Sequence, residues 1–186
     1  MVRASHPNQI IHGFTLVEVL ISILIVAIGF AGAIKLQTAA MQAIQQSIYI
    51  GDAGLLAAEM SDRMMGNTEM LTRVADNPYL KVNFRAGLNQ IAPASSCYQN
   101  RCNSDQLAAA DIAEWLHTIN AALPDVRAVI CRDDSAWNYS ADNFAWDCHS
   151  GSDHSGIVIK LGWTDKNDLQ HSAPPRLVIP AYAYQE

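Results

Sequence analysis

Glu18 is the residue whose chemistry most needs an explanation, because it is the only charged side chain between Gly13 and Ile34. A carboxylate at the centre of a membrane helix costs about 2.5–3.5 kcal/mol, and such a group usually has a partner. Two arrangements would tolerate it. Glu18 either lies at a membrane interface, where water solvates it, or meets a cation among packed apolar helices.

The segment that carries Glu18 has the length and composition of a membrane helix. Residues 14–34 form an apolar run of 21 residues, and a helix needs about 20 residues to cross the hydrocarbon core of a bilayer. The run directly follows Gly13 and does not end at a small-residue cleavage site. A secretory signal peptide has the opposite layout, so we expect a membrane helix.

The string GFTLVEVLI, residues 13–21, resembles the class III signal of type IV prepilins and type II secretion pseudopilins. In that family a membrane peptidase cleaves after the glycine and methylates the new N-terminal amine, and the helix stays in the mature protein. The resemblance implies a leader at residues 1–13, cleavage between Gly13 and Phe14, and N-methylation of Phe14. It also implies that Glu18 serves assembly, with its carboxylate against the Phe14 amine of a neighbouring subunit.

The length and the charge of the chain limit its domain organisation and the partners that it can bind. The chain has 186 residues, which fit one membrane helix and one modest domain. Without the leader, 11 lysine and arginine residues stand against 18 aspartate and glutamate residues. Nucleic-acid-binding proteins usually carry a basic stripe, so a nucleic acid is not an expected partner.

Four cysteines lie beyond the apolar run, which suits disulfides in an oxidising compartment. Four cysteines allow three pairings, and the sequential pairing closes the shortest loops. That pairing joins Cys97 to Cys102 and Cys131 to Cys148. The cysteines and the prepilin resemblance together place the domain after the helix on the periplasmic side of the inner membrane.

Two polar runs contain residue types that ligate metals, and neither leads us to expect a metal. In the run DCHSGSDH the cysteine is Cys148, and its expected disulfide leaves only a short polar turn; its other candidate ligands are His149, Asp153 and His154. In TDKNDLQ the residues Asp165, Asn167 and Asp168 suit calcium, but a turn between strands that is rich in Asp and Asn is the simpler explanation. We therefore expect neither a metal nor another cofactor.

The chain shows no pattern of catalytic residues. It lacks a Gly-x-Ser-x-Gly elbow, a phosphate-binding glycine loop and an evident pair of carboxylates in a cleft. An enzyme is not expected. The aromatic residues Trp137, Tyr139 and Trp146 could form an adhesive surface or cover a sheet, and the sequence leaves both possibilities open.

The order of elements predicts an α+β, pilin-like fold. The first helix should continue through residues 35–65 as an amphipathic half, with Leu36, Ala40, Ile44, Ile48, Leu55, Leu56, Met60 and Met64 as its apolar positions. Residues 66–186 should form the globular domain, with loops and short helical pieces from Gly66 to Ser96. A second helix is expected from Ser104 to Leu123, followed by strands at 126–131, 156–163 and 176–184, with Pro180 on an edge.

The stretch LAAADIAEWLHTINAALP, residues 107–124, is similar to the helix that precedes the sheet in PilV-like minor pilins, the pilus modification proteins. This resemblance implies a minor pilin that primes or modifies pilus assembly, with effects on adhesion and twitching motility. Its partners would be a prepilin peptidase, an inner-membrane assembly platform, and other minor and major pilins. It would reside in the inner membrane as a single-pass protein and in cell-surface pili. The alternatives are a type II secretion pseudopilin and a surface ligand-binding module.

Overall fold

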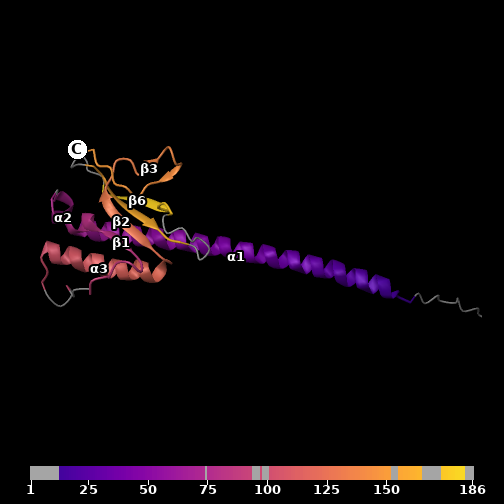
Figure 1. Ribbon diagram of the computed structural model, residues 1–186. Coiled ribbons are helices and arrows are strands. Elements are labelled where there is room, and N and C mark those ends of the chain that lie inside the picture. Colours follow the sequence, from indigo (N-terminus) through magenta and orange to yellow (C-terminus); the bar gives the residue numbers. More distant parts are fainter. Residues whose placement is uncertain are drawn as a thin grey trace, which may run out of the picture. The chain divides into compact units, whose positions relative to one another are not determined.

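The computed structural model describes residues 13–73, 75–93, 97, 101–151, 155–164 and 173–182. The chain divides into two compact units, Met1–Gln46 and Ser47–Glu186, which are considered separately below (Figure 1). In the first unit the described residues are 13–15, which are not helical, and the N-terminal part of helix α1, Leu16–Gly66. It is the one helix among the described residues that is long and apolar enough to cross a membrane.

The helices of the second unit begin and end at recognisable signals. Helix α1 ends at Gly66 and is followed by the short helix α2, Thr68–Thr72, and the 3-10 helix η1, Pro78–Lys81. Helix α3, Ser104–Ala122, begins with a capping box between Asn103 and Gln106, in which each side chain accepts the other's backbone N–H. The second helix predicted from the sequence is thus confirmed to within one residue.

An antiparallel sheet of four strands has the order β1-β2-β5-β6. The strands are β1, Asn83–Arg85; β2, Arg127–Arg132; β5, Ile157–Gly162; and β6, Leu177–Tyr182. Strands β2, β5 and β6 were predicted, and Pro180 lies in the edge strand β6 as expected. Strand β1 was not predicted, because three residues with one apolar side chain give little periodic signal.

The core of the second unit lies between the helices and the sheet. Helix α1 contributes a buried stripe of Ala53, Ala57, Met60 and Met64, and β5 contributes Ile157, Ile159 and Leu161 on one face. The two alanines leave room for close packing, and the Trp115 indole N–H of α3 donates to the Leu56 carbonyl at 2.8 Å. The predicted pilin-like architecture, a long helix packed on a small antiparallel sheet with an extra helix, is confirmed.

Only some of the apolar positions predicted for α1 are buried in the structure. Met60 and Met64 are buried as expected, but the side chain of Leu55 is 73% exposed, and Ile48 is exposed too. In the first unit, Leu36 and Ile44 are also exposed. The prediction relied mainly on large apolar residues and did not include Ala53 and Ala57, which are buried with Met60 and Met64. Small residues carry little hydrophobic signal, yet they permit the closest approach.

A polar network ties α1 to α3 beside this core. The Arg63 guanidinium contacts the carboxylates of Glu59 at 2.8 Å, Glu114 at 2.9 Å and Asp111 at 3.3 Å. The buried Tyr79 hydroxyl donates to Asp111 at 2.7 Å. Burial and this carboxylate raise the pKa of the Tyr79 phenol above its ordinary value. The network fixes how the two helices pack, because it satisfies polar groups at the edge of the core.

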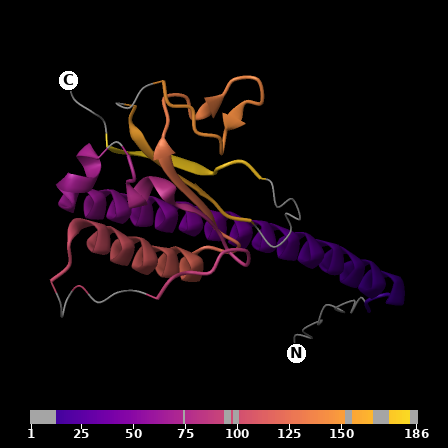
Figure 2. The ribbon, with the colours of Figure 1, turned by 60° about the vertical axis from the view of Figure 1, so that its left-hand side comes forward.

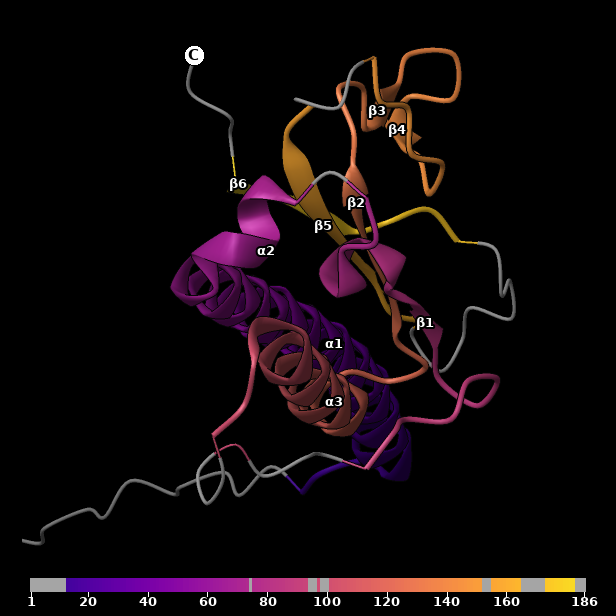
Figure 3. The same ribbon diagram turned by 90° about the vertical axis from the view of Figure 1, so that its left-hand side faces the viewer.

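A two-stranded hairpin lies on the side of the sheet away from α1 and α3 (Figures 2 and 3). Its strands are β3, Trp137–Asn138, and β4, Asn143–Phe144. The rings of Trp137 and Phe144 meet edge to face, with centroids 5.0 Å apart. The backbone N–H of Ala145 donates to the Ala136 carbonyl at 2.8 Å, which closes the base of the hairpin.

Candidate functional site

The residues around the expected cleavage position lie just ahead of helix α1. Gly13, Phe14 and Thr15 are exposed and non-helical, and the helix begins at Leu16. The Thr15 side-chain oxygen accepts the backbone N–H of Glu18 at 3.3 Å, and its carbonyl accepts the same N–H at 3.1 Å. Thr15 therefore acts as the N-terminal cap. The bond between Gly13 and Phe14 lies in exposed, non-helical chain, as a protease requires.

Glu18 lies in the first turn of α1. A negative charge there is favoured, because the N-terminus of a helix carries a partial positive charge. Within the part of the chain that the structure describes, no ion pair involves the Glu18 carboxylate, and the side chain is exposed. The carboxylate is available to a group from another molecule. Its pairing with a neighbouring Phe14 amine stays a prediction.

Both disulfides in the structure join cysteines that are close in sequence. Cys97 is bonded to Cys102, ahead of α3, with Cα atoms 5.6 Å apart. Cys131 is bonded to Cys148, with Cα atoms 6.3 Å apart. The second bond joins strand β2 to the segment that follows β4, so it crosses the base of the hairpin.

The polar run at residues 147–154 does not assemble a metal site in its described part. Cys148 is held in a disulfide, and His149 is exposed. Asp153, His154 and the run from Asp165 to Asp168 lie outside the described residues. Among those described, no group of three histidine, cysteine, aspartate or glutamate residues is placed to hold a metal ion.

The three aromatic residues singled out in the sequence have different environments. Trp146 covers the sheet: its indole N–H donates to the Ala173 carbonyl at 2.7 Å, and the Arg127 guanidinium lies 4.2 Å from the ring centroid. Tyr139 is 89% exposed, and Trp137 is half-buried beside Phe144. The sequence left open whether these residues cover the sheet or form an exposed surface. In the structure Trp146 covers the sheet and Tyr139 is exposed.

A buried ion pair beneath the hairpin was missed in the sequence. Lys160 of β5 lies 2.5 Å from the Asp133 carboxylate, and both side chains are fully buried. The Lys160 ammonium also donates to the carbonyls of Ala145 at 2.8 Å and Asp147 at 2.6 Å. Strand alternation could have indicated it, because Lys160 lies on the face opposite Ile159. Its partner, Asp133, lies 27 positions earlier in the chain, and no sequence pattern links the two residues.

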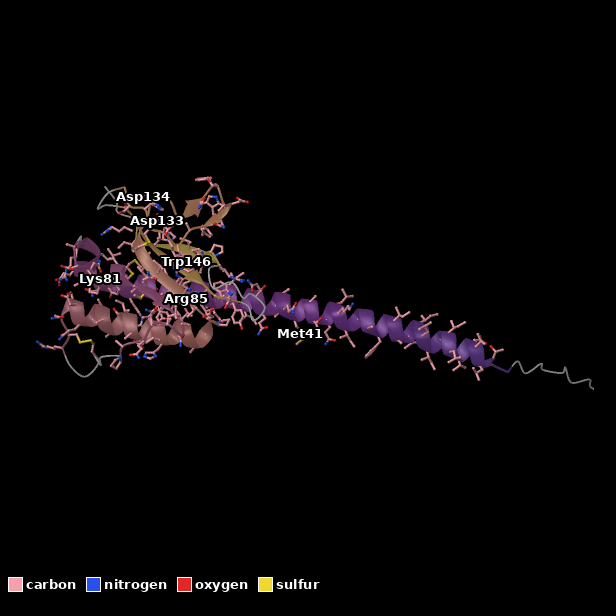
Figure 4. All side chains as sticks on the ribbon, viewed as in Figure 1. Met41, Lys81, Arg85, Asp133, Asp134 and Trp146 are labelled. Carbon is pink, nitrogen blue, oxygen red and sulfur yellow. A yellow bond between two sulfur atoms is a disulfide. The ribbon has the colours of Figure 1, made fainter. Side chains whose placement is uncertain are left out.

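Asp133 lies next to Asp134, just after strand β2 (Figure 4), and the groups around it explain how its carboxylate stays charged. Burial alone would raise its pKa. Hydrogen bonds from Lys160 and from the backbone N–H groups of Ser135 at 3.0 Å and His149 at 3.2 Å outweigh burial, so the pKa lies below its ordinary value. Asp133 thereby connects the segments on the two sides of the hairpin.

Comparison with protein families gives one match. Residues 10–34 match the model of the prokaryotic N-terminal methylation motif, which includes Gly13, Phe14 and Glu18. Neither the curated proteins nor the solved structures contain a match to the chain. The motif and the fold together support a type IV pilin-like or pseudopilin-like protein. A motif of this kind implies processing by a prepilin peptidase and assembly with other pilins, and it indicates a structural protein.

Proposed function

We propose that this chain is a minor pilin of a type IV pilus. The observation that carries the proposal is the methylation motif at residues 10–34, joined to a helix that packs on a small antiparallel sheet. The exposed Gly13–Phe14 bond and the exposed first-turn carboxylate of Glu18 fit a chain that is first cleaved and then assembled. The mechanism is interaction between subunits, not turnover of a substrate.

The proposal assigns a role to each part of the chain. Residues 1–13 are the leader, residues 14–34 are the membrane helix that later enters the filament core, and residues 35–65 continue the helix. Residues 66–186 form the globular domain, exported to the periplasm, where both disulfides would form. By its resemblance to PilV-like proteins, the chain primes or modifies assembly with other minor pilins and so affects adhesion and twitching motility.

Intact mass and N-terminal sequencing test the processing steps. The protein is isolated under non-reducing conditions from membranes and from sheared surface filaments. We expect a chain that begins at methylated Phe14, has lost four hydrogens to its two disulfides, and occurs in the sheared fraction. A chain that retains Met1 in cells with an active prepilin peptidase would overturn the proposal. Correct processing without any protein in filaments would favour a secretion pseudopilin instead.

Glu18 provides a second test, which concerns assembly alone. Glu18→Gln keeps the shape of the side chain and removes its charge, so processing at Phe14 should continue. Removing one partner of a buried ion pair costs about 3–5 kcal/mol, and incorporation into filaments should fall at least about tenfold. Ser22→Ala is the matched control, because Ser22 lies one turn later and its hydroxyl donates only to the Glu18 backbone carbonyl. Equal incorporation of both variants would contradict the assigned role.

A further inference from the structure

A groove lies between the β3–β4 hairpin and the segment that returns to the sheet. Its volume is about 360 Å³, and the residues that line it include Ser135, Trp137, Asn138, Tyr139, Asp147 and His149. Ligand sites in proteins commonly have volumes of about 300–1,000 Å³. The groove therefore has room for a small ligand of one or two rings.

The walls of the groove are fixed from below by buried groups. Asp133 accepts the backbone N–H of Ser135 on one wall and that of His149 on the other. Lys160 donates to the carbonyl of Asp147, and the Cys131–Cys148 disulfide closes the base. A binding site that is already ordered loses little entropy when it binds its ligand. The buried ion pair thus holds the groove open in one shape.

The tip of the hairpin is also ordered. The Asn138 side-chain oxygen accepts the backbone N–H groups of Ser140 at 3.0 Å and Ala141 at 3.1 Å, and Asp142 has a φ of 52°. These features form a compact turn of the kind that Asn and Asp favour. The turn presents Tyr139, which is 89% exposed, at a defined position beside the groove.

The groups that face the groove combine aromatic rings with short polar side chains. In the described part of the chain, neither the Trp137 indole N–H nor the Tyr139 hydroxyl has a hydrogen-bond partner. Tyrosine and tryptophan supply rigid contact area, and serine and asparagine supply adaptable hydrogen bonds. A sugar ring presents the complementary surface, because its C–H face packs on an aromatic ring while its hydroxyls exchange hydrogen bonds at the edge.

We propose that this groove binds a neutral saccharide. The charges decide between neutral and anionic ligands: the lining includes the Asp147 carboxylate and contains no lysine or arginine. Lys160 lies beneath it and is fully occupied by Asp133 and two carbonyls. The site does not depend on whether the chain is a pilin or a pseudopilin.

The test measures sugar binding to the full chain in micelles of an amine-oxide detergent, which carries no sugar. Saturation-transfer NMR and titration are performed with glucose, galactose, N-acetylglucosamine and lactose, with N-acetylneuraminic acid as the anionic comparison. We expect at least one neutral sugar to bind with a Kd of about 1–10 mM, the range for a ligand of this size. The transfer should be strongest to the ring C–H protons.

Tyr139→Ala should weaken this binding about fivefold or more, since the stacking surface is lost, and it should leave the fold intact because the side chain is exposed. Leu88→Ala is the matched control, because Leu88 is 75% exposed and is not among the residues that line the groove. The proposal is overturned if no neutral sugar shows transfer, if Tyr139→Ala binds as tightly as the unaltered chain, or if N-acetylneuraminic acid binds more tightly than the neutral sugars.

Discussion

Replacing Lys160 by methionine should destabilise the globular domain more than any change to a surface charge. Methionine has a similar length but no charge, so the Asp133 carboxylate would stay buried with only two backbone donors. The carbonyls of Ala145 and Asp147 would lose the ammonium that now lies 2.8 Å and 2.6 Å from them. Breaking a buried pair by removing one partner costs about 3–5 kcal/mol, and we expect a loss of that size.

The free energy of unfolding can be measured by urea titration of the full chain in micelles, followed by tryptophan fluorescence. Lys81→Met is the matched control. Lys81 pairs with Asp76 at 3.0 Å, but the two side chains are 65% and 87% exposed. Exposed pairs contribute about 0–1 kcal/mol, so this variant should remain close to the unaltered protein. The contrast isolates burial, since both substitutions remove a paired lysine.

Two results would refute the reasoning. The first is a loss below about 1 kcal/mol for Lys160→Met together with unchanged hydrogen exchange at the Ser135 and His149 amides, which donate to Asp133. The second concerns the double variant with Asp133→Asn. Asparagine keeps the acceptor oxygen and removes the buried charge, so the double variant should be more stable than Lys160→Met alone. Equal loss in both would show that the uncompensated charge is not the cause.

Three further predictions concern the same domain. Tyr79→Phe should cost about 1.5–3 kcal/mol at neutral pH, because it removes a hydrogen bond to a carboxylate. The raised pKa of the Tyr79 phenol contributes stability that is present below the ordinary pKa near 10 and is lost progressively as pH rises above 10. The difference in stability between the variant and the unaltered chain should therefore be smaller at pH 11 than at pH 8. Gly162→Ala should cost about 1–3 kcal/mol, because its Cβ would lie 2.7 Å from the Trp146 ring; an unchanged thermal midpoint would contradict this contact. Replacing both Cys131 and Cys148 by serine should cost about 3 kcal/mol, since the bond closes a loop of 17 residues; urea unfolding checks this value.

The helices and central strands could be predicted because their signals are local. The apolar run defines the start of α1, Pro124 ends α3, and the branched residues of GIVIKLGW indicate β5. The motif at Gly13 to Glu18 is equally local, which explains why the sequence alone indicates the segment that the methylation-motif model also matches.

The lining of the hairpin groove is local in sequence, but the buried ion pair that supports it could not be predicted, because its two residues are distant in sequence. Lys160 and Asp133 are brought together only when β5 pairs with β2. Each residue alone is an ordinary charged side chain, and the sequence does not show that both are buried. The different environments of Trp146 and Tyr139 are likewise a result of packing. Trp146 lies against Gly162 and Tyr139 lies in an exposed turn, but the sequence shows only that both residues are aromatic.

The contacts that hold the hairpin in place do not involve the residues at its tip, so the shape of the domain does not depend on the sequence of the tip. The disulfide, the Lys160 ammonium and the Asp133 carboxylate all act at the base, and the strand pairing of the sheet does not pass through residues 139–142. Lengthening a loop adds little entropic cost. A short peptide inserted between Ser140 and Ala141 should therefore leave the register of the sheet unchanged, which makes the position suitable for genetic display. The same insertion would break the turn that holds Tyr139 beside the groove, so the shape of the domain and sugar binding can be altered separately.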